Sequence, residues 1–154
     1  MSYINFIVTL VLLTSSIHNT EQGRVQIKCW AESCTKQNAQ IQNVKVDIYP
    51  IPPELGKNIT ILLSGTILEK VNSGRIYGEA RFNNFPPLRE TYDLCYILSY
   101  IGVLCPLVVG DVQYNVSKEV PRHAIPGNYT FTGTATDQMN NELLCLLGGC
   151  VITG

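Results

Sequence analysis

Residues 93–107 read Asp-Leu-Cys-Tyr-Ile-Leu-Ser-Tyr-Ile-Gly-Val-Leu-Cys-Pro-Leu, and they decide between two pictures of the fold. Cys95 and Cys105 enclose nine residues without a charge. A disulfide between them would close a short loop, with an entropic gain of roughly 2–3 kcal/mol. Surface loops are normally polar, whereas this one carries five aliphatic side chains, each worth about 1.5–3 kcal/mol on burial. Either the loop packs onto the core as a lid, or it borders a site for an apolar ligand or a membrane surface.

The composition excludes some classes of function. Of the 154 residues, 45% are hydrophobic and only 15% are charged, below the roughly 25% usual for soluble domains. Lys and Arg number 11 against 12 Asp and Glu, so there is no basic surface for nucleic acid. The length fits one domain, with or without a processed leader.

The beginning of the chain predicts a signal peptide at residues 1–20. An apolar run over Ile4–Leu13 is followed by small residues at 14–16, as at a cleavage site. The run is shorter than the roughly 20 residues that span a bilayer. We therefore expect a secreted protein with its folded domain at 21–154.

The rest of the chain alternates between short apolar-polar runs and turn residues, which is typical of antiparallel strands. Strands are predicted at 41–49, 58–63, 75–82, 112–116, 128–136 and 142–147, with 151–153 as a candidate extension. Residues 93–98 allow one helical turn with Asp93 as its N-cap. Because each strand has one apolar face, the pattern predicts an all-β sandwich of two facing sheets.

Three Asn-x-Ser/Thr acceptors are present, at Asn58, Asn115 and Asn128. In each predicted strand the asparagine falls on the polar face, where a bulky glycan has room. We expect all three to be glycosylated, in agreement with secretion.

Six cysteines, an even number, fit an oxidising compartment. Their spacings, C-x4-C, C-x9-C and C-x4-C, are poor for zinc, and no metal site is expected. The position numbers of Cys29 and Cys150 have the same sum as those of Cys34 and Cys145, as antiparallel neighbours require. The pairs Cys29–Cys150 and Cys34–Cys145 are therefore consistent with the spacing, while the other two pairings of these four cysteines stay open.

Few groups suit catalysis. His123, the one histidine outside the leader, lies in a turn-like Pro-Arg-His-Ala segment, and no spacing singles out a pair of carboxylates. Gly148-Gly149 is interpreted as a turn or bulge rather than a phosphate loop, since no helix follows. Trp30, beside Cys29, is expected to pack over a disulfide rather than to contact a ligand. We expect neither an enzyme nor a cofactor.

Several motifs, in this order, resemble the ML (lipid-recognition) superfamily. They are Cys34 ahead of the strand ending at Pro50, Pro52-Pro53-Glu54-Leu55-Gly56-Lys57-Asn58-Ile59-Thr60, Ser73-Gly74, Tyr92-Asp93-Leu94-Cys95, Cys105-Pro106-Leu107-Val108-Val109-Gly110, Ile125-Pro126-Gly127-Asn128-Tyr129 and Glu142-Leu143-Leu144-Cys145. The likeness covers roughly Cys34 to the C-terminus. It is greatest to the phosphatidylglycerol/phosphatidylinositol transfer proteins, followed by the Niemann–Pick type sterol carriers.

The resemblance implies an immunoglobulin-like sandwich whose sheets splay apart to form a lipid cavity. It also implies the disulfides Cys34–Cys145 and Cys95–Cys105, whereas Cys29–Cys150 rests on spacing alone. Each buried CH2 is worth about 0.8 kcal/mol, so an acyl chain or a sterol needs only a dry slot.

By this resemblance we expect a secreted or endolysosomal protein that holds one phospholipid or sterol and moves it between membranes, with transient contact at their surface. The alternative is a lipid-loaded co-receptor or innate-immune module that binds a protein receptor. The tip around Phe82 and Phe85 is expected to form the mouth of the cavity together with residues 96–104, with ordinary core packing as the alternative. The residues predicted to contact lipid are Val46, Ile48, Ile61, Leu63, Ile76, Phe82, Phe85, Tyr96, Tyr100, Ile101, Val103, Tyr114, Phe131 and Leu146.

Overall fold

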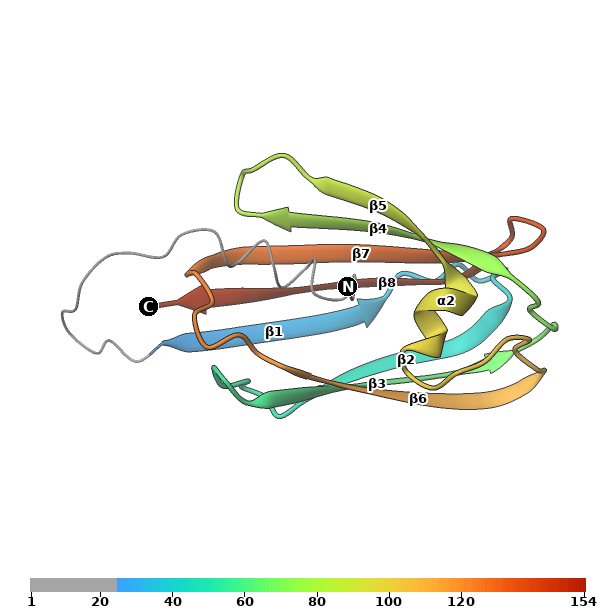
Figure 1. The fold of residues 1–154 in the computed structure, drawn as a ribbon, viewed down its shortest axis with the longest axis horizontal. Helices are drawn as coiled ribbons and strands as arrows, with labels where there is room; N and C mark the ends of the chain where they lie inside the picture. The colour runs from blue at the N-terminus through green and yellow to red at the C-terminus, as the bar shows by residue number, and fades with distance from the viewer. Residues whose placement is uncertain (1–24) are drawn as a thin grey trace.

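The computed structural model describes residues 25–154, and the predicted signal peptide lies outside the described residues. The described chain forms two antiparallel sheets and one short helix (Figure 1). The elements are β1 (Gln26–Ser33), β2 (Ile41–Tyr49), β3 (Asn58–Ile67), β4 (Gly74–Phe82), β5 (Leu88–Asp93), α2 (Leu94–Ser99), β6 (Gly110–Glu119), β7 (Gly127–Asp137) and β8 (Glu142–Thr153).

The strand order is β1-β8-β7-β4-β5 in the larger sheet and β2-β3-β6 in the smaller one. The predicted all-β sandwich is confirmed. Sequence alternation did not predict β1 and β5. Their inward positions do include large apolar residues, Ile27 in β1 and Leu88 and Tyr92 in β5, but the small Cys29 and Ala31, or the charged Glu90, interrupt the pattern that marks a buried face.

Strand β8 runs through Gly148 and Gly149 without a break and without a register shift, so the turn or bulge predicted there is wrong. The two glycines instead make room for aromatic rings on opposite faces of the strand. A Cβ at Gly148 would overlap the Phe131 ring, and one at Gly149 would lie 3.1 Å from Trp30 Nε1. Trp30 therefore lies on the outer face, on the other side of β1 from Cys29, and does not pack over the disulfide.

The sheets approach each other along one side and at one end. On the side, β1 lies next to β2, whereas the opposite outer strands, β5 and β6, make little or no contact. At the end, α2 covers a cluster of buried residues: Ile41, Ile67, Val71, Leu94, Leu107, Ala135 and Leu143. The predicted N-cap of α2 is confirmed, because the Asp93 carboxylate accepts a hydrogen bond from the Tyr96 amide at 2.8 Å.

The loop between Cys95 and Cys105 joins this closed end. Leu98 and Val103 pack against the buried cluster, so this part of the loop covers the core like a lid, as one of the two alternatives predicted. Leu104, by contrast, is 76% exposed. The end of the sandwich opposite α2, built by the β2–β3, β4–β5 and β6–β7 connections, is called the far end below (Figure 1).

All three disulfides form as predicted, namely Cys29–Cys150, Cys34–Cys145 and Cys95–Cys105. The first two join the beginning of the described chain to its last strand, β8. They hold β1 on the larger sheet, at the side where that sheet meets β2.

The Cys29–Cys150 and Cys34–Cys145 bonds close nearly the same loop, with sequence separations of 121 and 111. Replacing one pair by serine opens only the ring of roughly 10 residues between the two bonds, at a cost of about 3 kcal/mol. Replacing both pairs also releases the long loop, which adds about 5 kcal/mol. In urea unfolding followed by Trp30 fluorescence, we expect the combined loss to exceed the sum of the single losses. Strictly additive losses would contradict this.

Candidate lipid-binding site

Strand register sets the inner face of the smaller sheet. Two successive rows of residues face inward across β2, β3 and β6: Ile48, Ile61 and Val116, then Val46, Leu63 and Tyr114. The first five of these residues are aliphatic, and the sixth, Tyr114, has an aromatic ring. The outer positions between them carry polar residues such as Asp47 and Asn115. The inner face is therefore a continuous apolar surface.

The inner face of the larger sheet is equally apolar. Its central strands contribute these inward residues: Ile76, Ala80 and Phe82 from β4, Tyr129, Phe131 and Gly133 from β7, and Leu144 and Leu146 from β8. The threonines that alternate with them on β7 face outward, as the sequence pattern predicts.

Most of these inward residues are only partly buried, although they lie between two layers. Phe131 remains 37% exposed. When two sheets pack in contact, about 10 Å apart, their facing side chains interdigitate and lose contact with water. Beyond the buried cluster under α2, the two apolar faces are therefore accessible to solvent.

Gly133 shows this space most directly. It lies near the middle of β7, flanked by Leu146 on β8 and Gly78 on β4. It shares a face with Ala135, which belongs to the buried cluster, so it points inward. A Cβ on Gly133 would meet no heavy atom within 4 Å. Protein interiors are packed as densely as organic crystals, so an open position here marks unfilled space over the sheet.

Three tyrosines bring hydroxyl groups to the inner faces. Burial raises the pKa of Tyr114, and also that of Tyr92, where the nearby negative charge of Glu90 adds to the effect. Burial likewise raises the pKa of Tyr129, opposed by the hydrogen bond that its hydroxyl donates to the Ile125 carbonyl at 2.7 Å. All three side chains are neutral at physiological pH, so they add donors to the inner faces without adding charge.

Two exposed charged residues also have the inward register, Lys118 on β6 and Glu90 on β5. Lys118 pairs with Ile59 at the far end, one row beyond the aliphatic rows. Neither side chain forms an ion pair with another residue of the described part. Sequence reasoning missed both, although the alternation through Tyr114 and Val116 extends directly to Lys118.

Most residues predicted to contact lipid lie on the two inner faces. They are Val46, Ile48, Ile61, Leu63, Ile76, Phe82, Tyr114, Phe131 and Leu146. The structure brings these residues from both sheets toward one interior, which the linear pattern could not show.

The two apolar tips do not form one mouth, contrary to the prediction. Strands β4 and β5 run the length of the larger sheet, with Phe82 at one end and the Arg75–Asp93 pair at the other. Phe85 consequently lies at the far end, stacked on Phe82 with ring centroids 5.9 Å apart. The remaining predicted contacts lie in or after α2 at the closed end: Tyr96, Tyr100, Ile101 and Val103.

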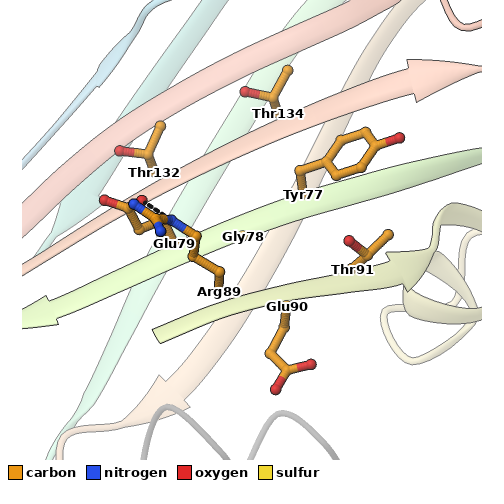
Figure 2. A pocket seen from close by; sticks show the side chains of 8 residues that line it. All are labelled: Tyr77, Gly78, Glu79, Arg89, Glu90, Thr91, Thr132 and Thr134. Atoms are coloured by element: carbon orange, nitrogen blue, oxygen red, sulfur yellow. Dashed lines mark hydrogen bonds and ion pairs between the residues drawn. The ribbon is translucent and has the colours of Figure 1, made fainter. Parts of the chain in front are cut away.

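A different concavity lies on the outer face of the larger sheet (Figure 2). This open groove of about 520 Å³ is lined by the outward residues Tyr77, Glu79, Arg89, Thr91, Thr132 and Thr134, together with Gly78 and Glu90, which have inward register. The Nε–H groups of Arg89 and Arg81 each donate a 2.7 Å hydrogen bond to Glu79 and hold the pKa of its carboxyl below the ordinary value. A carboxylate held by two guanidinium groups is a poor general base, so Glu79 is not suited to take a proton here.

Within residues 25–154, no group of His, Cys, Asp and Glu is placed to hold a metal ion. None of the helices in that part of the chain is long and apolar enough to cross a membrane.

These features define a disulfide-bonded β-sandwich with an accessible apolar interior, a binding-protein architecture. The chain belongs to the ML domain family, whose model matches residues 28–149.

Two relatives from different organisms are named for phosphatidylglycerol/phosphatidylinositol transfer. The chain is 32% identical over 117 residues to the phosphatidylglycerol/phosphatidylinositol transfer protein of Aspergillus oryzae, covering 75% of this chain and 67% of the relative. It is 30% identical over 144 residues to the putative phosphatidylglycerol/phosphatidylinositol transfer protein 2 of Dictyostelium discoideum, covering 94% of each. Both names describe transfer proteins, in agreement with the expectation that this chain is not an enzyme.

Solved structures share the fold. Chicken MD-1 complexed with lipid IVa matches with a TM-score of 0.56 at 16% identity, over 86% of this chain and 93% of that one. A Niemann-Pick type C2 protein from Japanese carpenter ant matches with a TM-score of 0.50 at 14% identity, over 77% and 95%.

Proposed function

We propose that this protein binds one phospholipid between its sheets and transfers it between membranes, in the secretory or endolysosomal lumen. The observation that carries the proposal is the unfilled space over Gly133, bordered by two apolar faces. The names of the relatives, and the lipid bound by MD-1, support the same function.

Hydrocarbon burial supplies the binding energy. Each CH2 removed from water contributes about 0.8 kcal/mol, and an apolar chain needs no hydrogen-bond partner. The aliphatic rows through Ile61 and Leu63 on one sheet, and Phe131 on the other, provide such surfaces on both sides of the ligand. No chemical step is required.

Lys118 favours a phospholipid over a sterol. The residue lies in the inward register at the far end, one row beyond the aliphatic rows, and is exposed. A phosphate headgroup at this end would meet a cation, whereas the hydroxyl of a sterol would gain little from it.

The far end is also the proposed membrane contact. Phe85 is 64% exposed in the β4–β5 connection, and Ile51 is exposed in the β2–β3 connection. The chain carries nearly balanced charge, so membrane contact here depends on apolar insertion rather than on attraction to anionic lipids.

A lipid-loaded interaction module is the second candidate function. It is favoured by the closed end, where Leu104, Val108 and Val109 stay exposed although they are apolar. A receptor that covers these residues would leave the interior available for lipid.

The first prediction of the proposed function concerns the space over Gly133. In the variant Gly133→Leu, the new side chain displaces two to three CH2 groups of ligand, and phospholipid affinity falls roughly 15- to 50-fold. Stability is retained, because the residue has ordinary strand geometry and an open volume to fill. Uptake of a fluorescent phosphatidylglycerol and urea unfolding measure the two effects.

The variant Thr134→Leu is the matched control, since it adds a similar side chain on the outer face of the same strand. We expect it to bind lipid like the parent protein. Full lipid affinity in a well-folded Gly133→Leu protein would show that lipid does not occupy this space.

The second prediction concerns headgroup choice. Lys118→Gln removes one exposed charge pair worth about 0.2–1 kcal/mol, so preference for phosphatidylglycerol over a sterol falls by up to about fivefold. The control Lys45→Gln removes a charge from the outer face of β2 and leaves the preference unchanged. The measurement is competition between the two lipids, and equal preferences in all three proteins would remove the argument for Lys118.

The third prediction separates the two ends of the molecule. Phe85→Ser slows transfer between neutral vesicles by about tenfold or more, because it removes an apolar side chain worth about 1.5–3 kcal/mol at the membrane. Lipid affinity at equilibrium stays the same. Val109→Ser, at the closed end, leaves the transfer rate unchanged, and the reverse result would place membrane contact at the closed end.

A further inference from the structure

The outer face of the larger sheet carries an apolar patch that the proposed function does not use. Trp30, the one tryptophan of the chain, is 41% exposed, and Val151 is 39% exposed. Both have outward register, on β1 and β8, so neither borders the space between the sheets. An indole that stays exposed on a sheet face does not gain the free energy that burial of its large apolar surface would provide.

Strand register places an N-glycan acceptor at the edge of this patch. Asn128 on β7 lies directly opposite Val151 on β8, which in turn lies opposite the exposed Lys28 on β1. The next outward row holds Thr130, Gly149 and Trp30. Side chains directly opposite on one face have Cβ atoms about 4.5–5.5 Å apart. From strand spacing and rise, the Cα atoms of Asn128 and Gly149 are about 8 Å apart.

The position of the indole brings it closer still. A Cβ on Gly149 would lie 3.1 Å from Trp30 Nε1 and 3.3 Å from Thr130 Cγ2. The ring therefore extends from β1 across β8, over a strand position without a side chain, toward Thr130. That threonine is the third residue of the acceptor Asn128-Tyr129-Thr130.

The backbone at the acceptor is fixed. The Asn128 amide donates to Asn83 Oδ1 at 2.8 Å, and its carbonyl accepts from the Asn83 amide at 2.8 Å. Asn128 itself is exposed. A glycan attached here starts from a defined place and direction on the sheet.

A pyranose ring has a face of C–H groups that packs on the electron-rich face of an indole and on aliphatic side chains. Covalent attachment at Asn128 would hold the first sugar rings beside such surfaces at high effective concentration. We propose that Asn128 carries an N-linked glycan whose first sugar rings pack on Val151 and Trp30 and cover this patch. The proposal rests on glycosylation of Asn128 and not on the binding of lipid.

The acceptor Asn115 provides an internal comparison. It lies on the outer face of the other sheet, in a row with Leu62 and Asp47. A glycan at Asn115 therefore points away from Trp30 and has no route to it across the sandwich.

Trp30 is the only tryptophan, so its fluorescence reports on the patch alone. The test uses the protein secreted by eukaryotic cells, with glycan occupancy measured by mass spectrometry of glycopeptides. Acrylamide quenching of Trp30 is expected to be about twofold stronger in Asn128→Gln than in the parent protein, because the ring loses its cover. Asn115→Gln is expected to match the parent.

Thermal unfolding gives a second, independent readout. In the protein that retains Trp30, the glycan at Asn128 raises Tm by roughly 2–4 °C, the shift expected when one modest contact is added to a chain of about 150 residues. In the Trp30→Ser background the gain disappears, which identifies the contact as the cause. An unoccupied Asn128, equal quenching with and without the glycan, or the same gain in Tm in both backgrounds would overturn the proposal. Each outcome is independent of lipid uptake.

Discussion

Two apolar sheet faces that stay apart are the constraint on which this structure depends. Apolar area buried on folding is worth roughly 25 cal/mol per Å², so leaving these faces accessible sacrifices stability that a packed sandwich would have. The molecule must therefore be held together elsewhere. The buried cluster under α2, the β1–β2 side and the three disulfides serve this purpose.

The arrangement resembles a wedge, joined along one side and one end. Disulfides at Cys29 and Cys34 fix β1 to β8, so the larger sheet keeps its edge beside β2. At the α2 end, the loop closed by Cys95–Cys105 places Leu98 and Val103 on the core. Strands β5 and β6 therefore lie apart in the folded domain. The space between the two sheets is apolar on both sides.

Much of this architecture could be predicted from the sequence, because alternation and cysteine spacing are local signals. The strand faces, the inward set around Ile61 and Phe131, and the Asp93 cap follow directly from such patterns. How far apart the two ends of a hairpin lie is not a local signal. The prediction of one mouth from both apolar tips was wrong for this reason, since β4 and β5 carry Phe82 and Asp93 to opposite ends of the sheet.

The structural roles of the glycines were the hardest to predict from the sequence. Gly148 and Gly149 suggested a turn, but they are strand positions that accept the rings of Phe131 and Trp30 from either face. Gly133 gave no signal at all in the sequence, yet it marks the open interior. A missing side chain means different things depending on what the neighbouring strands place beside it, and only the folded arrangement supplies those neighbours.

The most direct measurement of the central claim is native mass spectrometry of the protein purified from its own source and then offered phospholipid vesicles. The proposed carrier is expected to show one added mass of a single phospholipid per chain, retained under gentle conditions and exchanged after exposure to vesicles. Protein recovered only without lipid, and still without lipid after vesicles are offered, would mean that the two sheets do not hold a ligand.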